Sequence, residues 1–203
     1  MQRRNEILEA TCQVVIDRGF AATRVSDVAN RLGVSTGLIH YHFDSKELLL
    51  AEALRYAAEQ DIARLEQELE QAPTALAKLD AMFAFDLPEA GEPSWTLWID
   101  GWGEAIRNPA MRRISHDLDL AWKDRLRAII LAGVANGEFT CPDAEGAAWR
   151  LSSLLDGLGV QFTVHDALTR TQLLRHMRAA AALELGIDER AFKRPRRRVQ
   201  ASA

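Results

Sequence analysis

The 203-residue sequence contains few of the residues that cross-link a chain or interrupt its helices: two cysteines, six prolines and twelve glycines. Glycine and proline this sparse exclude collagen-like and low-complexity chains. Cys12 and Cys141 stand far apart, and neither has a second cysteine at C-x-x-C spacing, which excludes zinc-ribbon and thioredoxin-type redox sites. We expect Cys12 to be a small buried hydrophobe in a helix and Cys141 to lie in a loop.

Long apolar runs are also missing from the sequence. No stretch approaches the roughly 20 apolar residues that a membrane-spanning helix requires. The charged residues 1–6 lead into an amphipathic segment rather than the apolar run of a secretory signal. We therefore predict a cytoplasmic protein with no membrane partner. Because 48% of its residues are hydrophobic, the chain can bury a core in one or two domains.

The negative charge is concentrated in the middle of the chain, although the total is only −4. Residues 1–47 carry six basic and six acidic side chains, residues 48–190 carry 14 and 23, and residues 191–203 carry five and none. An acidic body does not exclude nucleic-acid binding by the neutral first segment. We predict two domains with these limits, followed by a basic, disordered tail. That tail is either a solvated end or a source of additional phosphate contacts.

Apolar residues recur every three to four positions almost throughout, which predicts an all-α fold of nine helices and no strand. We place the helices at about residues 4–18, 24–32, 36–42, 46–72, 74–87, 93–107, 109–136, 144–165 and 170–185. The residues predicted to cap helix N-termini are Thr23, Ser35, Asp44 or Ser45, Asp143 and Thr169. The connections are mostly short, which favours antiparallel packing of neighbouring helices.

Two short helices joined by Leu32-Gly33-Val34 form a helix–turn–helix pattern. Gly33 allows the positive φ that the turn requires. The second helix begins with Thr36 and Gly37, at the end that a recognition helix presents to the major groove. Thr36 can hydrogen-bond to a base or contact a thymine methyl, and Gly37 allows close backbone approach. Tyr41 and Lys46 are suited to contacts with phosphates.

A longer set of residues extends this pattern in register: Ile7-Leu8-Glu9-Ala10, Arg18-Gly19-Phe20, Thr23, Val28-Ala29, Leu32-Gly33-Val34-Ser35, Ile39-His40-Tyr41-His42-Phe43 and Ser45-Lys46-Glu47-Leu48. Residues 4–50 thereby resemble the N-terminal domain of the tetracycline-repressor (TetR/AcrR) family. The resemblance implies a homodimeric transcriptional regulator, usually a repressor, that a small ligand releases from its operator in double-stranded DNA. The predicted DNA-contact residues are Thr23, Arg24, Ser35, Thr36, Gly37, Leu38, His40, Tyr41, His42 and Lys46. His40 departs from the family, where tyrosine is frequent.

Neither catalysis nor metal binding is indicated. His40 and His42 are two residues apart on a helix, so their side chains point about 200° apart and cannot chelate one ion together. The sequence has no G-x-S-x-G, H-E-x-x-H or phosphate-binding loop. We therefore expect no catalytic residue, no metal and no cofactor. The alternative to a regulator is a helical ligand-binding protein without a transcriptional role.

The predicted helix 93–107 is rich in tryptophan. Trp95, Trp98, Ile99, Trp102 and Ile106 share one face, which Met82, Phe83, Phe85 and Trp122 could meet. Two interpretations stay open: an ordinary aromatic core, or the wall of a ligand cavity. The predicted ligand-contact residues are Met82, Phe85, Trp95, Trp98, Trp102 and Trp122.

The effector class also stays open between a cationic amine and an uncharged apolar or aromatic compound. Carboxylates lie nearby in sequence at Asp86, Asp100, Glu104, Asp117 and Asp119, although Asp100 and Glu104 project away from the tryptophan face. The segment from Trp98-Ile99-Asp100 to Arg107-Asn108-Pro109 is similar to the betaine-regulator (choline-sensing) branch of the family, mainly in architecture.

The last two predicted helices are apolar on more than one face, so each needs a second partner besides its own domain. We expect a four-helix dimer interface, with Gly157 and Gly159 permitting close helix approach. The predicted interface residues are Leu151, Leu155, Leu158, Phe162, Leu174, Met177 and Ala181.

Overall fold

The computed structural model describes residues 2–88 and 94–193, and this part of the chain is helical and contains no strand. The elements are α1 (Gln2–Arg18), α2 (Val25–Leu32), α3 (Thr36–His42), α4 (Lys46–Glu70), α5 (Ala75–Asp86), α6 (Ser94–Ala105), α7 (Pro109–Ala135), α8 (Ala144–Thr163), α9 (Arg170–Leu185) and the short 3-10 helix η1 (Glu189–Lys193). All nine predicted helices are confirmed. The predicted disordered tail, 191–203, begins too early, because residues 191–193 belong to η1 and Phe192 is buried in the core; residues 194–203 lie outside the described residues.

Side-chain caps set where most helices begin. Hydroxyl or carboxylate oxygens of Ser35, Ser45, Asp143 and Thr169 accept hydrogen bonds from backbone N–H groups three residues later, as predicted. The prediction for Thr23 is wrong, because Arg24 is the N-cap residue of α2. The Thr23 hydroxyl instead donates to the Gly19 carbonyl oxygen at 2.7 Å, which turns the side chain into the interior.

The first three helices and the start of α4 enclose a small core of their own. Its apolar members include Ile7, Val28, Ile39 and Phe43. Gly33 adopts φ +66° at the end of α2, which lets the chain turn sharply into α3. Cys12 is buried in this core, as predicted, and burial raises the pKa of its thiol to about 12.

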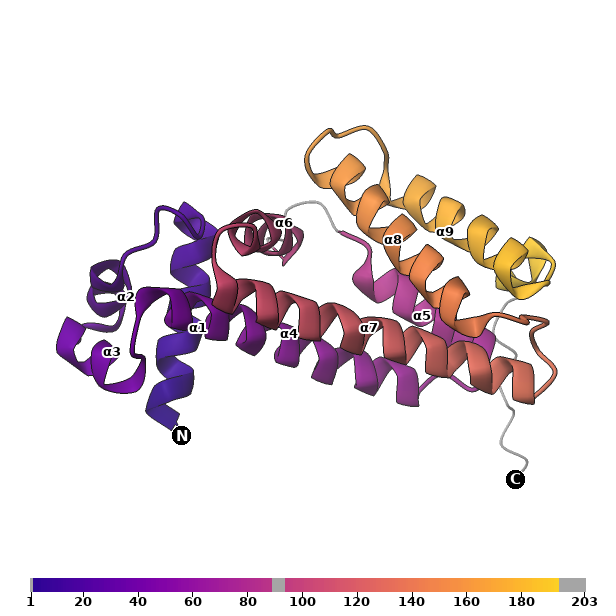
Figure 1. Cartoon of the computed structure of the whole chain (residues 1–203). Coiled ribbons are helices and arrows are strands. Elements are labelled where there is room, and N and C mark those ends of the chain that lie inside the picture. The colour runs from indigo at the N-terminus through magenta and orange to yellow at the C-terminus, as the bar shows by residue number, and fades with distance from the viewer. Residues whose placement is uncertain (1, 89–93, 194–203) are drawn as a thin grey trace, which may run out of the picture.

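Helices α4 and α7 lie side by side along the length of the molecule and connect this small unit to the rest (Figure 1). A large core joins α5, α7, α8 and α9, and a smaller one forms where α1, α4, α6 and α7 meet. The predicted domain limit at residue 47 falls in the first turn of α4, which continues unbroken into the body, so that limit stays a prediction. None of the described helices has the length and apolar character needed to cross a bilayer.

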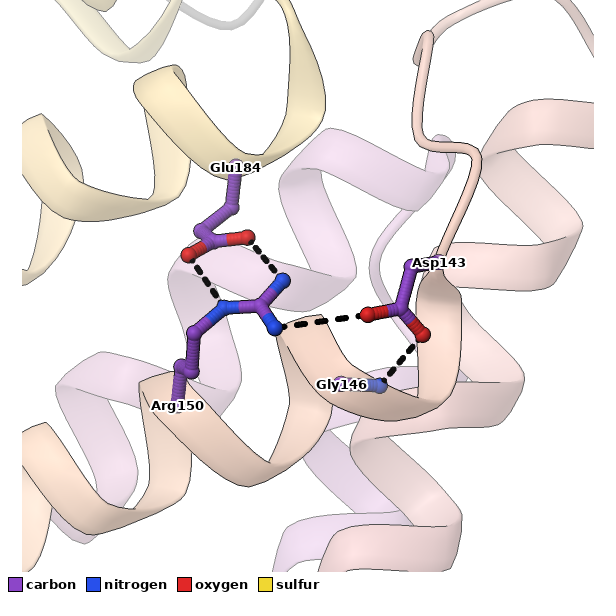
Figure 2. A network of polar contacts seen from close by, with 4 residues as sticks. All are labelled: Asp143, Gly146, Arg150 and Glu184. Carbon is purple, nitrogen blue, oxygen red and sulfur yellow. Dashed lines mark hydrogen bonds and ion pairs between the residues drawn. The ribbon is translucent and has the colours of Figure 1, made fainter.

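A polar network ties the first turns of α8 to the end of α9 (Figure 2). The Arg150 guanidinium donates two hydrogen bonds to Glu184, at 2.7 and 2.6 Å, and a longer one of 3.3 Å to Asp143. Asp143 also accepts the Gly146 N–H at 2.9 Å. These hydrogen bonds hold the pKa of both carboxyls below their usual range. The network therefore links α8 to α9 at the surface, outside the apolar core that the two helices share.

Candidate DNA-binding face and ligand cavity

Helix α3 has one buried face and one face that projects from the molecule. The small unit made of α1, α2, α3 and the start of α4 is called the head. Ile39, within α3, and Phe43, directly after it, are almost fully buried and anchor α3 to the core of the head. Thr36, Gly37 and Tyr41 lie on the outer face, and Tyr41 is 82% exposed. The outer side chains of α3 are therefore free to contact another molecule.

Two cations flank this face without an acidic partner among the described residues. Arg24 is exposed at the N-terminus of α2, and Lys46 begins α4, where its ammonium donates to the Ala21 carbonyl oxygen at 3.4 Å. Other arginines of the head form ion pairs, including Arg31 with Asp17 at 2.7 Å and Arg18 with Asp27 at 3.4 Å. The guanidinium of Arg24 and the ammonium of Lys46 therefore form no ion pair within the described part of the head, although the exposed carboxylates Asp44 and Glu47 stand close to Lys46 in sequence.

The remaining predicted DNA-contact residues divide into accessible and inaccessible groups. Ser35 and His40 are exposed, and Leu38 and His42 are half-buried. Thr23 is only 1% exposed, so its prediction as a surface contact is wrong for the same reason as its prediction as a cap.

A cavity of about 270 Å³ lies between α4, α5, α6, α7 and α8. Five of the predicted ligand-contact residues line it together: Phe85, Trp95, Trp98, Trp102 and Trp122. Trp95 meets Trp102 edge to face, with ring centroids 6.1 Å apart, and the Trp98 ring lies 6.4 Å from Trp102. The aromatic stripe thus forms a wall of the cavity and does not only fill the core.

Some residues predicted to belong to the aromatic stripe, or to face it, lie elsewhere. Met82 and Phe83 are buried in the body core and do not line the cavity, because α5 turns that face toward the core. Ile99 lines a different groove beside α1, and Ile106 follows the end of α6 and is 69% exposed.

Trp95 is held in a fixed position from two sides. Its indole N–H donates to the Asp86 carbonyl oxygen at 2.6 Å. Its ring edge packs against Gly159 so closely that a Cβ there would lie 2.0 Å from two ring carbons. Gly159 therefore serves the cavity wall, whereas a Cβ on Gly157 would meet nothing within 4 Å.

The cavity also contains polar residues that the sequence analysis missed: Asp61, Arg64, Ser115, Ser152 and Asp156. The available signal was Ser152 and Asp156, which stand one turn apart on an otherwise apolar face of α8. Ser152 is only 4% exposed, and the structure records no hydrogen bond for its hydroxyl within the described part of the chain. This hydroxyl is therefore available to a ligand.

The carboxylates of the cavity outnumber its cations. Arg64 contacts Asp61 and Lys123 contacts Asp119, which leaves Asp86 and Asp156 without a basic partner among the residues described. Burial, and then the negative charges of Asp156 and Asp61, raises the pKa of Asp86 to about 8. Burial also raises the pKa of Asp156 to about 6, against the influence of Lys123. The site therefore favours a positive charge.

Comparison with known proteins agrees with both parts of this geometry. Residues 7–53 match the family described as "Bacterial regulatory proteins, tetR family", and residues 75–186 match "BetI-type transcriptional repressor, C-terminal". The chain belongs to the tetR family of bacterial regulatory proteins. This tetR-family protein is a transcriptional regulator, and its C-terminal part is of the BetI type.

Individual relatives of this tetR-family regulator cover most of its length. It is 30% identical to the HTH-type transcriptional regulator BetI of Cronobacter sakazakii, over 89% of this chain and 93% of that protein. A transcriptional regulator from Saccharomonospora viridis in complex with choline is 32% identical, with a TM-score of 0.79, over 88% of this chain and 94% of that one. A TetR-family regulator from Rhodococcus sp. is 25% identical, with a TM-score of 0.80, over 91% of this chain and 100% of that one.

Four predicted dimer residues of the tetR-family regulator lie in the core of their own subunit: Leu151, Leu155, Met177 and Ala181. These predictions are wrong, because side chains buried against α5, α7 and each other cannot contact a second copy. Leu158, Phe162 and Leu174 are half-buried and partly accessible. Leu183 on α9, which is not among the predicted interface residues, is 86% exposed.

Proposed function

We propose that this tetR-family regulator is a repressor that binds a palindromic operator as a homodimer and leaves it when a cationic amine enters the cavity. The observation that carries the proposal is the pairing of an outward-facing α3 with a tryptophan-walled, carboxylate-rich cavity. A ligand-binding protein without a transcriptional role would need the cavity but not the projecting recognition helix.

The DNA-binding part of the proposal rests on the outer face of α3. Thr36 and Gly37 lie at its N-terminal end, where a recognition helix contacts base edges. Arg24 and Tyr41 are exposed and Lys46 is half-buried, and they supply a guanidinium, a phenol and an ammonium for phosphate oxygens. In this arrangement the phosphate contacts orient the head and Thr36 reads sequence.

The effector part rests on charge and aromatic surface. Indole faces attract cations, most strongly in a site shielded from water. A positive ligand pairs with the Asp156 carboxylate and with Asp86 once Asp86 releases its proton, whereas an uncharged apolar effector would leave the Asp156 charge without compensation. Choline is the natural probe, because the related Saccharomonospora viridis regulator was crystallised with it.

The dimer part rests on the outer faces of α8 and α9. Leu158, Phe162 and Leu174 are only partly covered within one subunit, and Leu183 is exposed. A second copy related by a two-fold axis would cover these side chains and set the distance between the two α3 helices.

Fluorescence anisotropy on a labelled duplex from the region upstream of its own gene tests the proposal. We expect the protein to bind this duplex more tightly than a scrambled duplex at the same salt concentration, and saturating choline to weaken the binding about tenfold or more. Equal affinity for both duplexes would contradict the DNA-binding part. Specific binding that choline leaves unchanged would contradict the effector part.

A further inference from the structure

Helix α6 faces the cavity on one side and the DNA-binding head on the other. Trp98 and Trp102, four residues apart, share the cavity face. Asp100 lies between them in sequence, so its side chain points about 200° away from both. Figure 1 shows α6 beside α1, at the end of the body nearest the head.

Asp100 makes a direct hydrogen bond to the head. Its Oδ2 accepts the backbone N–H of Phe20 at 2.6 Å. Phe20 follows Gly19, which adopts φ +80° directly after α1 and whose Cβ, if present, would lie 3.0 Å from the same oxygen. The carboxylate therefore fits closely against the turn between α1 and α2.

The surrounding contacts make this turn part of the DNA-binding machinery. The Gly19 carbonyl oxygen accepts both the N–H and the hydroxyl of Thr23, which precedes α2. The next residue of α6, Gly101, packs near the Phe20 ring, where its Cβ would lie 3.5 Å away. A shift of α6 would therefore move Phe20 and, through Gly19 and Thr23, the start of α2.

Helix α4 provides a second connection, but of a different kind. Leu49 and Ala53 belong to the head core, and Ala58 and Asp61 line the cavity on the same continuous helix. That connection runs along one continuous helix, whereas the contact of Asp100 with the Phe20 N–H is a single hydrogen bond that can break and re-form. It is therefore a contact whose state can differ between the two forms of the protein.

We propose that Asp100 is the positioning residue that couples ligand in the cavity to the DNA-binding head, through its hydrogen bond to the Phe20 N–H. This inference rests on the proposed function, because it assigns the route by which a cationic effector weakens DNA binding. Asp100 contacts neither the DNA face nor the cavity, so it acts through α6 and the turn at Gly19–Phe20.

The test compares full-length wild type with Asp100→Ala, Asp100→Asn and the matched control Glu104→Ala. Glu104 lies one turn further along α6, and its one ion pair among the described residues is with Arg107, at 3.9 Å. For each protein, calorimetry gives the choline Kd, and anisotropy gives the Kd for the upstream duplex with and without saturating choline. The ratio of the two DNA Kd values is the coupling factor.

We expect the coupling factor to be about tenfold or more in wild type and Glu104→Ala, and to fall below about twofold in Asp100→Ala. The choline Kd and the choline-free DNA Kd should each stay within about threefold of wild type. Asn retains a carbonyl acceptor, so Asp100→Asn should preserve most of the coupling. If Asp100→Ala does not fold, Asp100→Ser, whose side chain is too short to reach Phe20, replaces it.

Hydrogen exchange gives a readout that a purely structural role would not change. Choline should accelerate exchange of the Phe20 amide in wild type and Glu104→Ala. Three outcomes would each overturn the inference. The coupling factor of Asp100→Ala could equal that of wild type, or the factor of Asp100→Asn could be as low as that of Asp100→Ala. The exchange rate of the Phe20 amide could also stay the same when choline is added. Loss of the choline response in wild type itself would instead overturn the proposed function, and this inference with it.

Discussion

Among the carboxyls that line the cavity, Asp86 has the pKa that is raised furthest from its ordinary value. It lies at the end of α5, lines the cavity and has no basic partner among the described residues. Because its folded pKa of about 8 lies above the ordinary 3.8, Asp86 binds more protons in the folded than in the unfolded chain between these values. The free energy of unfolding therefore falls as pH rises across that window, and a bound cation offsets the loss.

The affinity for choline should rise with pH. A bound cation favours the ionised carboxyl, so binding below pH 8 must release the Asp86 proton. Calorimetry should give a Kd about tenfold or more lower at about pH 9 than at about pH 6, with proton release visible in buffers of different ionisation enthalpy. Asp86→Asn should remove most of this dependence. Asp117→Asn, at an exposed site on α7, should retain it, and loss in both variants would contradict the assignment.

On α3, Thr36 and the nearby Lys46 should differ in how their loss affects DNA binding. Lys46→Ala should weaken binding to all duplexes and reduce the slope of log K against log salt by about one, because an ammonium releases counterions from phosphate. Thr36→Ala should keep the slope and change the preferred sequence. Arg127→Ala, an ion-paired arginine on the body, is the control for the slope. If Thr36→Ala reduced the slope of log K against log salt more than Lys46→Ala does, the result would contradict these roles.

The sequence predicted the roles of individual residues well where a role depends on neighbours in the sequence. Ser35, Asp143 and Thr169 cap their helices because a cap depends only on the next three residues. Thr23 looked equivalent, but the Gly19 carbonyl four residues earlier competes for its hydroxyl. The sequence could not predict that Asp61 and Asp156 line the same cavity, because nearly a hundred residues separate them and only the fold brings them together.

Helix α8 illustrates how a regular pattern leaves the role of a face open. Its periodicity predicted the helix and its apolar character, but not which apolar face meets the body of its own subunit. Leu151 and Leu155 point to that body, and Ser152 and Asp156 point to the cavity. Gly157 and Gly159 look alike in sequence, yet only Gly159 receives the Trp95 ring.

The two glycines of α8 therefore provide a matched pair of substitutions. Gly159→Ala places a methyl group against the Trp95 ring, which Asp86 and Trp102 hold in place, so it should raise the choline Kd about tenfold or more and lower the melting temperature. Gly157→Ala adds a methyl group to open space and should stabilise the helix by about 0.5–1 kcal/mol, with an unchanged Kd. Thermal melts and tryptophan fluorescence check both. If the two substitutions changed the choline Kd and the melting temperature equally, Gly159 would not shape the cavity.

The assembled chain is elongated, with the α3 head at one end and the α8–α9 pair on the body (Figure 1). In the proposed dimer, two bodies fixed together would set the separation of the two heads and so control DNA binding. Helix α6 lies between head and cavity, so in the proposed coupling a small change at the cavity would change the position of the head. The resemblance to the family predicted the architecture, whereas the contacts of α6 with the turn after α1 could be identified only in the structure.

Sedimentation equilibrium should show a dimer at micromolar concentration. Leu183→Glu places a charge on the exposed face of α9 and should shift the protein to monomer while leaving its helical content unchanged. Leu131→Glu makes the same change on the exposed side of α7 and should remain dimeric. A dimer that survives Leu183→Glu but not Leu131→Glu would place the interface on α7 instead.

Hydroxyl-radical footprinting on the upstream duplex tests most directly whether two α3 helices enter DNA together. The account predicts two protected patches on one face of the duplex, about one helical turn or a whole number of turns apart, within an inverted repeat. Saturating choline should remove both patches together. A single patch, or protection without regular spacing, would contradict binding by a pair of recognition helices.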